Sequence, residues 1–162
     1  MRAQPFHDGH LRLIETMKNN CDDCIVIIGS IQESNTSRNP LDFETRKLLI
    51  NNIIPDQKVV GLKDLGNPPK WADYVLDFLK PLSPDVYFAG SQQDADWFKN
   101  KVENVVSINR DDTKHCTVSA SELRDMLKNK NPEWKNFVHH KNHKIIEEKL
   151  YGKSLESPNP RA

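Results

Sequence analysis

The sequence predicts an α/β protein in which helices flank a parallel sheet. Four short runs of apolar, mostly β-branched residues are continuous rather than alternating, which is typical of strands buried on both faces. Helical patterns lie between these runs, and strands that alternate with helices pair in parallel through right-handed crossovers. The predicted strands are residues 24–30, 58–62, 85–90 and 104–108.

The helices are predicted from the spacing of apolar residues and from capping signals. In the first helix, Leu11, Ile14 and Met17 share one face. Near the C-terminus, Ser119 and Glu122 are three residues apart, which is the spacing of a capping box. The predicted helices are residues 10–20, 43–53, 71–79, 119–127 and 143–152.

The size and charge of the chain restrict its class. With 162 residues we expect one domain, residues 1–152, followed by a polar, Pro-rich flexible tail, 153–162. The chain has 23 basic and 23 acidic residues, a balance that argues against nucleic acid or a membrane surface as partner. Three cysteines are too few for a disulfide framework, so we expect a cytoplasmic protein.

The segment MRAQPFHDGH concentrates polar and special residues at the start of the first predicted helix. Gly9 removes a side chain where the backbone must approach a ligand, and His10 opens the helix. The free N–H groups and the dipole of a helix N-terminus favour a phosphate there. His7 and His10 add two imidazoles that can donate hydrogen bonds to its oxygens.

This segment resembles the opening of the HxGH nucleotidyltransferases, and within them the archaeal-type and Nudix-fused nicotinamide mononucleotide (NMN) adenylyltransferases. Met1 stands at the family's glycine and Ala3 at its aromatic residue or methionine. Further similar blocks follow in order: GSIQESNTSRNPLDFETR, KDLGNPPKWADYV, AGSQQDADWF and VSASELR. The matching residues of the first segment are Arg2, Gln4, Pro5, Phe6, His7, Gly9 and His10.

The resemblance implies a Rossmann-like nucleotidyltransferase fold and an enzyme that joins ATP and NMN into NAD and pyrophosphate. It implies that His7, His10, Arg2 and Arg124 are the catalytic residues, and that Trp71, Asp64 and Arg38 bind NMN. Mg²⁺ is expected on the ATP phosphates, without a dedicated set of protein ligands. The implied ATP-binding residues are Gln4, Pro5, Phe6, Gly9, Gly90, Ser119 and Ser121.

The family's sheet begins with a short apolar strand that ends at the glycine now replaced by Met1. We therefore expect the sheet to lack its first, central strand, and the natural product to begin upstream of Met1. Repair of the sheet by another segment or by a partner chain is the alternative.

Other functions fit the same signature. Pantetheine-phosphate adenylyl transfer or cytidylyl transfer to a small phosphoalcohol would keep the fold and change the substrate. A nucleotide-binding module without turnover belongs to another class. A homo-oligomer is expected only by analogy with the relatives.

Overall fold

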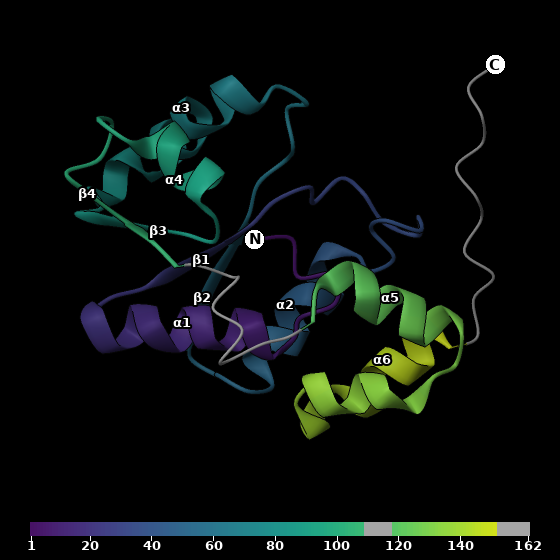
Figure 1. Cartoon of the computed structure of the whole chain (residues 1–162). Coiled ribbons are helices and arrows are strands. Elements are labelled where there is room, and N and C mark those ends of the chain that lie inside the picture. The colour runs from purple at the N-terminus through teal and green to yellow at the C-terminus, as the bar shows by residue number, and fades with distance from the viewer. Residues whose placement is uncertain (109–117, 152–162) are drawn as a thin grey trace, which may run out of the picture.

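The computed structural model describes residues 1–108 and 118–151. Four strands and six longer helices alternate through this part of the chain (Figure 1). The strands are β1 (Ile25–Ile28), β2 (Lys58–Gly61), β3 (Val86–Ala89) and β4 (Asn104–Ser107). The helices are α1 (Asp8–Asn20), α2 (Phe43–Asn51), α3 (Pro68–Leu79), α4 (Gln92–Phe98), α5 (Ala120–Lys128) and α6 (His143–Leu150).

The α/β class and all four predicted strands are confirmed. The predicted helix 71–79 begins earlier, at the Pro-Pro pair, because proline fits the first turn of a helix. Four described elements were not predicted: α4, which Ser91 caps, and the short 3₁₀ helices Lys80–Leu82, Pro132–Phe137 and His140–Asn142. Gly152 and the predicted tail lie outside the described residues, and no described helix has the length and apolar character needed to cross a membrane.

The strands form two separate parallel pairs. β1 pairs with β2 in the register Ile25 to Lys58, and β3 pairs with β4 in the register Val86 to Asn104. Within the described residues no ladder joins β1 to β3, so each of these strands has one edge without a strand partner. The predicted parallel sheet is thus present as two halves.

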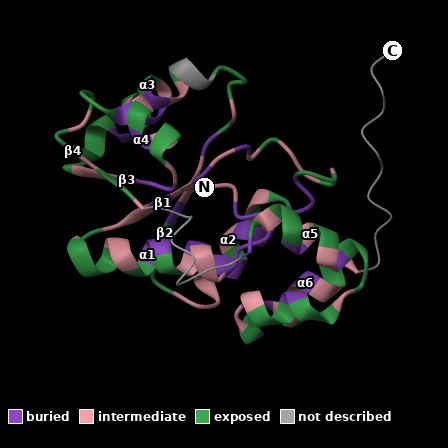
Figure 2. Cartoon of the chain, in the orientation of Figure 1, coloured by how far each residue is buried: buried purple, intermediate pink, exposed green. Residues whose placement is uncertain are grey.

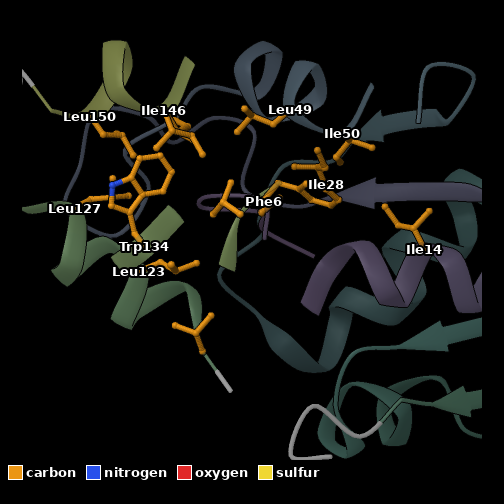
Figure 3. Packing of buried hydrophobic residues seen from close by; sticks show 14 of the residues in the cluster. Phe6, Ile14, Ile28, Leu49, Ile50, Leu123, Leu127, Trp134, Ile146 and Leu150 are labelled. Atoms are coloured by element: carbon orange, nitrogen blue, oxygen red, sulfur yellow. The ribbon is translucent and has the colours of Figure 1, made fainter. Parts of the chain in front are cut away.

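Two hydrophobic clusters pack on these strands. The larger one lies around β1, α1, α2, α5 and α6, and Trp134 of the 3₁₀ helix fills its C-terminal part (Figure 3). The smaller one joins α3, α4, β3 and β4, and it reaches β1 through Ile27. Figure 2 shows buried segments at the centre of both halves, with exposed turns on the outer helices.

Candidate active site

The turn between Met1 and α1 is held by hydrogen bonds from both histidines. His7 is the N-cap of α1, and its Nδ1 accepts from the backbone N–H of Gly9 at 3.1 Å. The Nδ1 of His10 accepts in turn from the N–H of His7 at 3.3 Å. Because each Nδ1 is an acceptor, the proton of each neutral ring lies on Nε2. Both rings can therefore donate from Nε2, and their centroids lie 3.9 Å apart.

The residues between Arg2 and His7 fix the shape of this turn. Ala3 is buried with a left-handed φ of 52°. The Gln4 amide donates to the Leu41 carbonyl at 2.8 Å and accepts from the Leu41 N–H at 2.9 Å. Phe6 is buried in the larger cluster, and its ring stacks on His10 with centroids 5.8 Å apart. The side chains of Gln4 and Phe6 thus hold the turn in place. Pro5, which lies between these two residues in the sequence, is also buried.

Arg124 reaches the same turn from α5. One guanidinium nitrogen donates to the Gln4 carbonyl at 2.9 Å, and another donates to Ser121 Oγ at 2.9 Å. Burial lowers the pKa of Arg124, and the positive charges of Arg38 and Arg2 lower it further, against the opposing effect of Asp125. The charges of Arg2 and Arg38, from distant parts of the chain, therefore act on the guanidinium of Arg124.

Such a concentration of cations favours an anion among them. Arg38 is exposed on the loop after β1. Arg2 makes a salt bridge with Asp64 at 3.7 Å, and both side chains remain more than a third exposed. We call the residues His7, His10, Arg2, Arg38 and Arg124 the phosphate cradle, after the ligand that the sequence analysis predicts for them.

A fourth arginine, Arg46 of α2, has a structural role: it binds backbone carbonyls next to the cradle residue Arg2. Its side chain is fully buried and donates to the carbonyls of Arg2 at 3.1 Å, Gly29 at 2.9 Å and Ser30 at 3.2 Å. Burial lowers the pKa of Arg46, although Asp42 and Glu33 raise it. Arg46 thus joins the turn at Arg2 to the carboxyl end of β1. Nothing in the sequence around Thr45 and Arg46 predicts that the guanidinium of Arg46 is buried.

Asp64 is fixed at the end of β2 by neighbouring loops. Its Oδ2 accepts from Ser30 Oγ at 3.1 Å and its Oδ1 accepts from the Gly66 N–H at 3.0 Å. The Gln32 side chain bonds both backbone groups of Asp64, each at 3.1 Å. Ser30 and Gln32 belong to the GSIQ stretch, so this motif positions Asp64, a role that the sequence alone did not reveal.

Trp71 lies at the carboxyl end of β1. A Cβ placed on Gly29 would lie 3.6 Å from its indole ring, which is ordinary van der Waals contact. The ring is half-buried and tilts against Tyr74, with centroids 6.0 Å apart. Trp71 and Asp64 thus lie near Gly29 and Ser30 at one end of the strand pair.

The remaining predicted site residues have local partners. Ser119 caps α5: its Oγ accepts from the Glu122 N–H at 3.2 Å, and the Glu122 carboxylate accepts from the Ser119 N–H and Oγ, both at 2.7 Å. The Gly90 N–H donates to Asp94 at 3.3 Å. Within the described residues no group of three or more His, Cys, Asp or Glu side chains could hold a metal ion.

The parallel α/β fold, with a cationic cradle at the start of α1 and at α5, defines the protein as a Rossmann-like nucleotidyltransferase. The family-level comparison agrees: the chain belongs to the cytidylyltransferase-like family, whose sequence profile matches residues 2–149.

The chain is similar to curated archaeal enzymes. It is 29% identical over 144 residues to the nicotinamide-nucleotide adenylyltransferase of Methanococcus aeolicus, covering 85% of this chain and 79% of that protein. It is 32% identical over 120 residues to the enzyme of the same name from Saccharolobus solfataricus, covering 68% of this chain and 69% of that protein.

A solved structure shares the fold. The bifunctional NMN adenylyltransferase/ADP-ribose pyrophosphatase of Francisella tularensis, complexed with AMP and a manganese ion, matches with a TM-score of 0.69 at 21% identity. The match covers 93% of this chain and 48% of that one, so the chain spans about half the length of this solved protein.

Proposed function

We propose that the chain joins ATP and NMN to give NAD and pyrophosphate. The observation that supports this function best is the phosphate cradle, in which Arg124 donates to the turn that carries both histidines and feels the charges of Arg2 and Arg38. The names of the archaeal relatives supply the substrates. Trp71 lies near Gly29, and Asp64 is bonded to Ser30 and paired with Arg2, so these two residues supply the second half of the site.

The reaction is an in-line displacement at phosphorus. An oxygen of the NMN 5′-phosphate forms a bond to the α-phosphorus of ATP, while the bond from that phosphorus to the α–β bridging oxygen breaks. Pyrophosphate leaves with the bonding electrons. Little covalent chemistry is required of the protein, so positioning and charge stabilisation account for most of the catalysis.

Each residue of the cradle has a role in this proposal. His10 and His7 donate from Nε2 to the phosphate oxygens at the start of α1, where negative charge develops. Arg124 presents a planar fork to the β- and γ-phosphates, and its bond to Ser121 orients it. Arg2 adds positive charge at the α-phosphate, and Arg38 holds the phosphate of NMN. Gly9 and Gly90 have no side chain, so the backbone at these two positions can approach ATP closely.

The nicotinamide half of the site lies at Trp71. A cationic pyridinium is attracted to an indole face, and Asp64 is held rigidly enough to fix a polar group of NMN. The described residues offer no ready-made cluster of metal ligands, and the cradle is cationic. Mg²⁺ therefore fits as a companion of ATP, where it neutralises phosphate charge. We propose a cytoplasmic enzyme, acting without nucleic acid.

One assay tests the proposal. Purified protein is incubated with Mg²⁺-ATP and NMN, and NAD and pyrophosphate are measured by chromatography. We expect both products in equal amounts. Product formed only with phosphopantetheine, or from CTP with a phosphoalcohol, would assign another transferase reaction. Tight ATP binding without any product would assign a nucleotide-binding module. Size-exclusion chromatography of the same sample reports whether the protein is a homo-oligomer.

A further inference from the structure

Arg46 of α2 is a buried cation to which the proposed function gives no role. Burial lowers its pKa and the charge of Arg2 lowers it further, while Asp42 and Glu33 raise it. A guanidinium keeps its charge at neutral pH, so a buried one requires hydrogen-bond acceptors. Arg46 finds them among backbone carbonyls: Nε donates to Asp42 at 3.3 Å, and the terminal nitrogens donate to residues outside α2. These outside contacts indicate a role beyond the stability of its own helix.

The terminal nitrogens of Arg46 join two segments that are distant in the sequence. Nη1 donates to the Arg2 carbonyl at 3.1 Å and to the Gly29 carbonyl at 2.9 Å. Nη2 donates to the Ser30 carbonyl at 3.2 Å. The Gly29 N–H also donates to the Met1 carbonyl at 3.0 Å, so the two segments lie side by side at this point. Because a guanidinium is planar and its N–H directions are fixed, Arg46 sets the spacing of the three carbonyls.

The backbone next to these carbonyls has an unfavourable conformation in both segments. Ala3, which follows Arg2, has a φ of 52°, and Ser30 has a φ of 54°. Left-handed backbone is disfavoured for residues with a side chain, and it persists only where the surrounding structure holds it. The hydrogen bonds from Arg46 restrain the chain at both places.

Each of the two segments carries one half of the proposed site. Arg2 belongs to the phosphate cradle and begins the turn that leads to its two histidines. Ser30 Oγ donates to Asp64 at 3.1 Å, and Gly29 lies near the Trp71 ring. One buried guanidinium therefore bonds the backbone on the side proposed for ATP and on the side proposed for NMN.

We propose that Arg46 is a positioning residue that fixes the ATP half of the site relative to the NMN half. This inference rests on the proposed function. In-line transfer requires close alignment of the reacting groups, and a misplacement of about 1 Å can lower the rate about 10²-fold. Either substrate alone still meets the contacts of its own half. Loss of the Arg46 bonds should therefore reduce turnover more than it weakens the binding of ATP or of NMN.

The test compares two variants of Arg46 with a matched control. Arg46→Lys keeps a positive charge without the planar fork, and Arg46→Met keeps a chain of similar length that donates nothing. Asn142→Ala is the control: Asn142 is also fully buried, but its side chain bonds only Leu49 and Asn52 among the described residues, neither of which is in the proposed site.

Three quantities are measured at a temperature below the melting transition of every variant. These are kcat per folded molecule, the Kd of ATP and of NMN each bound alone, and the ¹³C shifts of the carbonyls of Arg2, Gly29 and Ser30 in the free protein. We expect kcat to fall about 10²-fold in both Arg46 variants. Each Kd should change by less than about threefold, because binding of one substrate does not require the alignment. The three carbonyl signals should move in both Arg46 variants, and Asn142→Ala should lose stability but keep kcat and these signals.

An equal loss of kcat in Asn142→Ala would overturn the proposal, because the effect would then follow stability alone. Weaker binding of both substrates with an unchanged kcat would overturn it as well. The carbonyl signals separate this inference from the proposed function, since they need no turnover. If the parent formed no NAD, the proposed function would fail, and unmoved carbonyl signals in Arg46→Lys and Arg46→Met would refute the restraint by Arg46.

Discussion

At the scale of single residues, the sequence predicts only phosphate binding for His7 and His10, whereas the structure shows that both rings also stabilise the first turn of α1. The Nδ1 atoms of His7 and His10 hold the first turn of α1, and the proposed function assigns their Nε2 atoms to a phosphate. A variant of His7 that removes the whole ring therefore loses the cap of α1 as well as the donor that we propose for catalysis. Substitutions that preserve only the capping acceptor can separate these roles.

We predict that His7→Asn keeps the stability of the protein and loses most of its activity. Asparagine is a good N-cap whose side-chain oxygen can accept from the Gly9 N–H, but it has no imidazole to reach the ATP phosphates. NAD formation should fall by about 10²–10³-fold. His7→Ala should show the same loss of activity and in addition cost about 1 kcal/mol of unfolding free energy. Thermal unfolding and initial rates of both variants check this, and near-normal turnover by His7→Asn would contradict the catalytic role.

We predict that Trp71→Ala weakens the use of NMN more than the use of ATP. The ring lies near Gly29, where the proposal assigns it to nicotinamide, while the cradle residues are assigned to the ATP phosphates. Loss of stacking on a pyridinium should raise the KM for NMN about tenfold. The KM for ATP should change less than threefold. Trp71→Phe is the matched control, since it keeps an aromatic face, and equal increases in both KM values would exclude the stacking role.

At the scale of elements, Arg38 and Asp64 lie on loops that follow strands, and at Gly61 the end of β2 packs closely against the loop after β1 and the start of α2. A Cβ on Gly61 would lie 2.7 Å from Ile31 Cγ2 and 2.8 Å from the ring of Phe43. Ile31 is on the loop after β1, and Phe43 begins α2. The end of β2 can therefore pack here only without a side chain.

We predict that Gly61→Ala destabilises the protein by about 1–3 kcal/mol, because overpacking must displace Ile31 or Phe43. Gly29→Ala is the matched control: its added methyl would meet only the Trp71 ring, at 3.6 Å. Chemical denaturation of both variants measures the difference. Equal destabilisation of the two would show that the contact at Gly61 relaxes at little cost.

The N-cap of α2 makes stability depend on acid. The pKa of Asp42 is lowered chiefly by the hydrogen bond that its carboxylate accepts from the Thr45 N–H at 2.7 Å, with burial opposing. A lowered folded-state pKa means that Asp42 adds stability above its unfolded pKa, and that this contribution is lost as the pH falls through the folded value.

We predict that Asp42→Asn flattens the loss of stability below about pH 4, where the carboxylate of the parent begins to bind a proton. Asparagine keeps a capping acceptor that does not titrate. Melting temperatures from pH 7 to pH 3 should converge for the variant and the parent at the acidic end. Parallel curves over the whole range would show that Asp42 does not contribute to the acid sensitivity.

At the scale of the whole molecule, pattern and motif predicted most of the architecture. Continuous apolar runs identified every strand among the described residues, although the expected burial on both faces is wrong for β4, which is mostly exposed. The motif residues His7, His10, Arg2 and Arg124 could be selected because their spacing is distinctive. The structural roles of Arg46, Gln4 and Ser30 could not be predicted in this way, since they depend on partners that only the folded chain brings near.

The C-terminal segment was less predictable. Trp134 is fully buried and donates to Tyr151 Oη at 3.0 Å, while buried Asn142 donates to the Leu49 carbonyl at 2.8 Å. Both contacts join residues to partners whose proximity depends on the tertiary fold, so no local periodicity reveals them. These contacts attach the C-terminal helices to the larger hydrophobic cluster. The smaller cluster contains no residue of these helices.

The two clusters should therefore open separately. The half formed by α3, α4, β3 and β4 has the smaller cluster and no strand pairing to β1, so it should unfold locally at a lower free energy than the rest. We predict faster amide exchange in β3, β4 and α4 than in β1, α2 and α5, measured by mass spectrometry at neutral pH.

Paired substitutions identify the cooperative units. Phe98 stacks on Tyr87 with ring centroids 3.6 Å apart, and Phe98→Ala should accelerate exchange in the α3–β4 half alone. Trp134→Ala should cost a similar 3–5 kcal/mol or so, but should accelerate exchange chiefly in β1, α2 and α5, because these amides exchange only when the larger cluster opens. If Phe98→Ala accelerated exchange equally throughout the described residues, the molecule would unfold as one unit. The packing of Ile27 against the smaller cluster, which includes residues of α3, would then be sufficient to make the two halves unfold together.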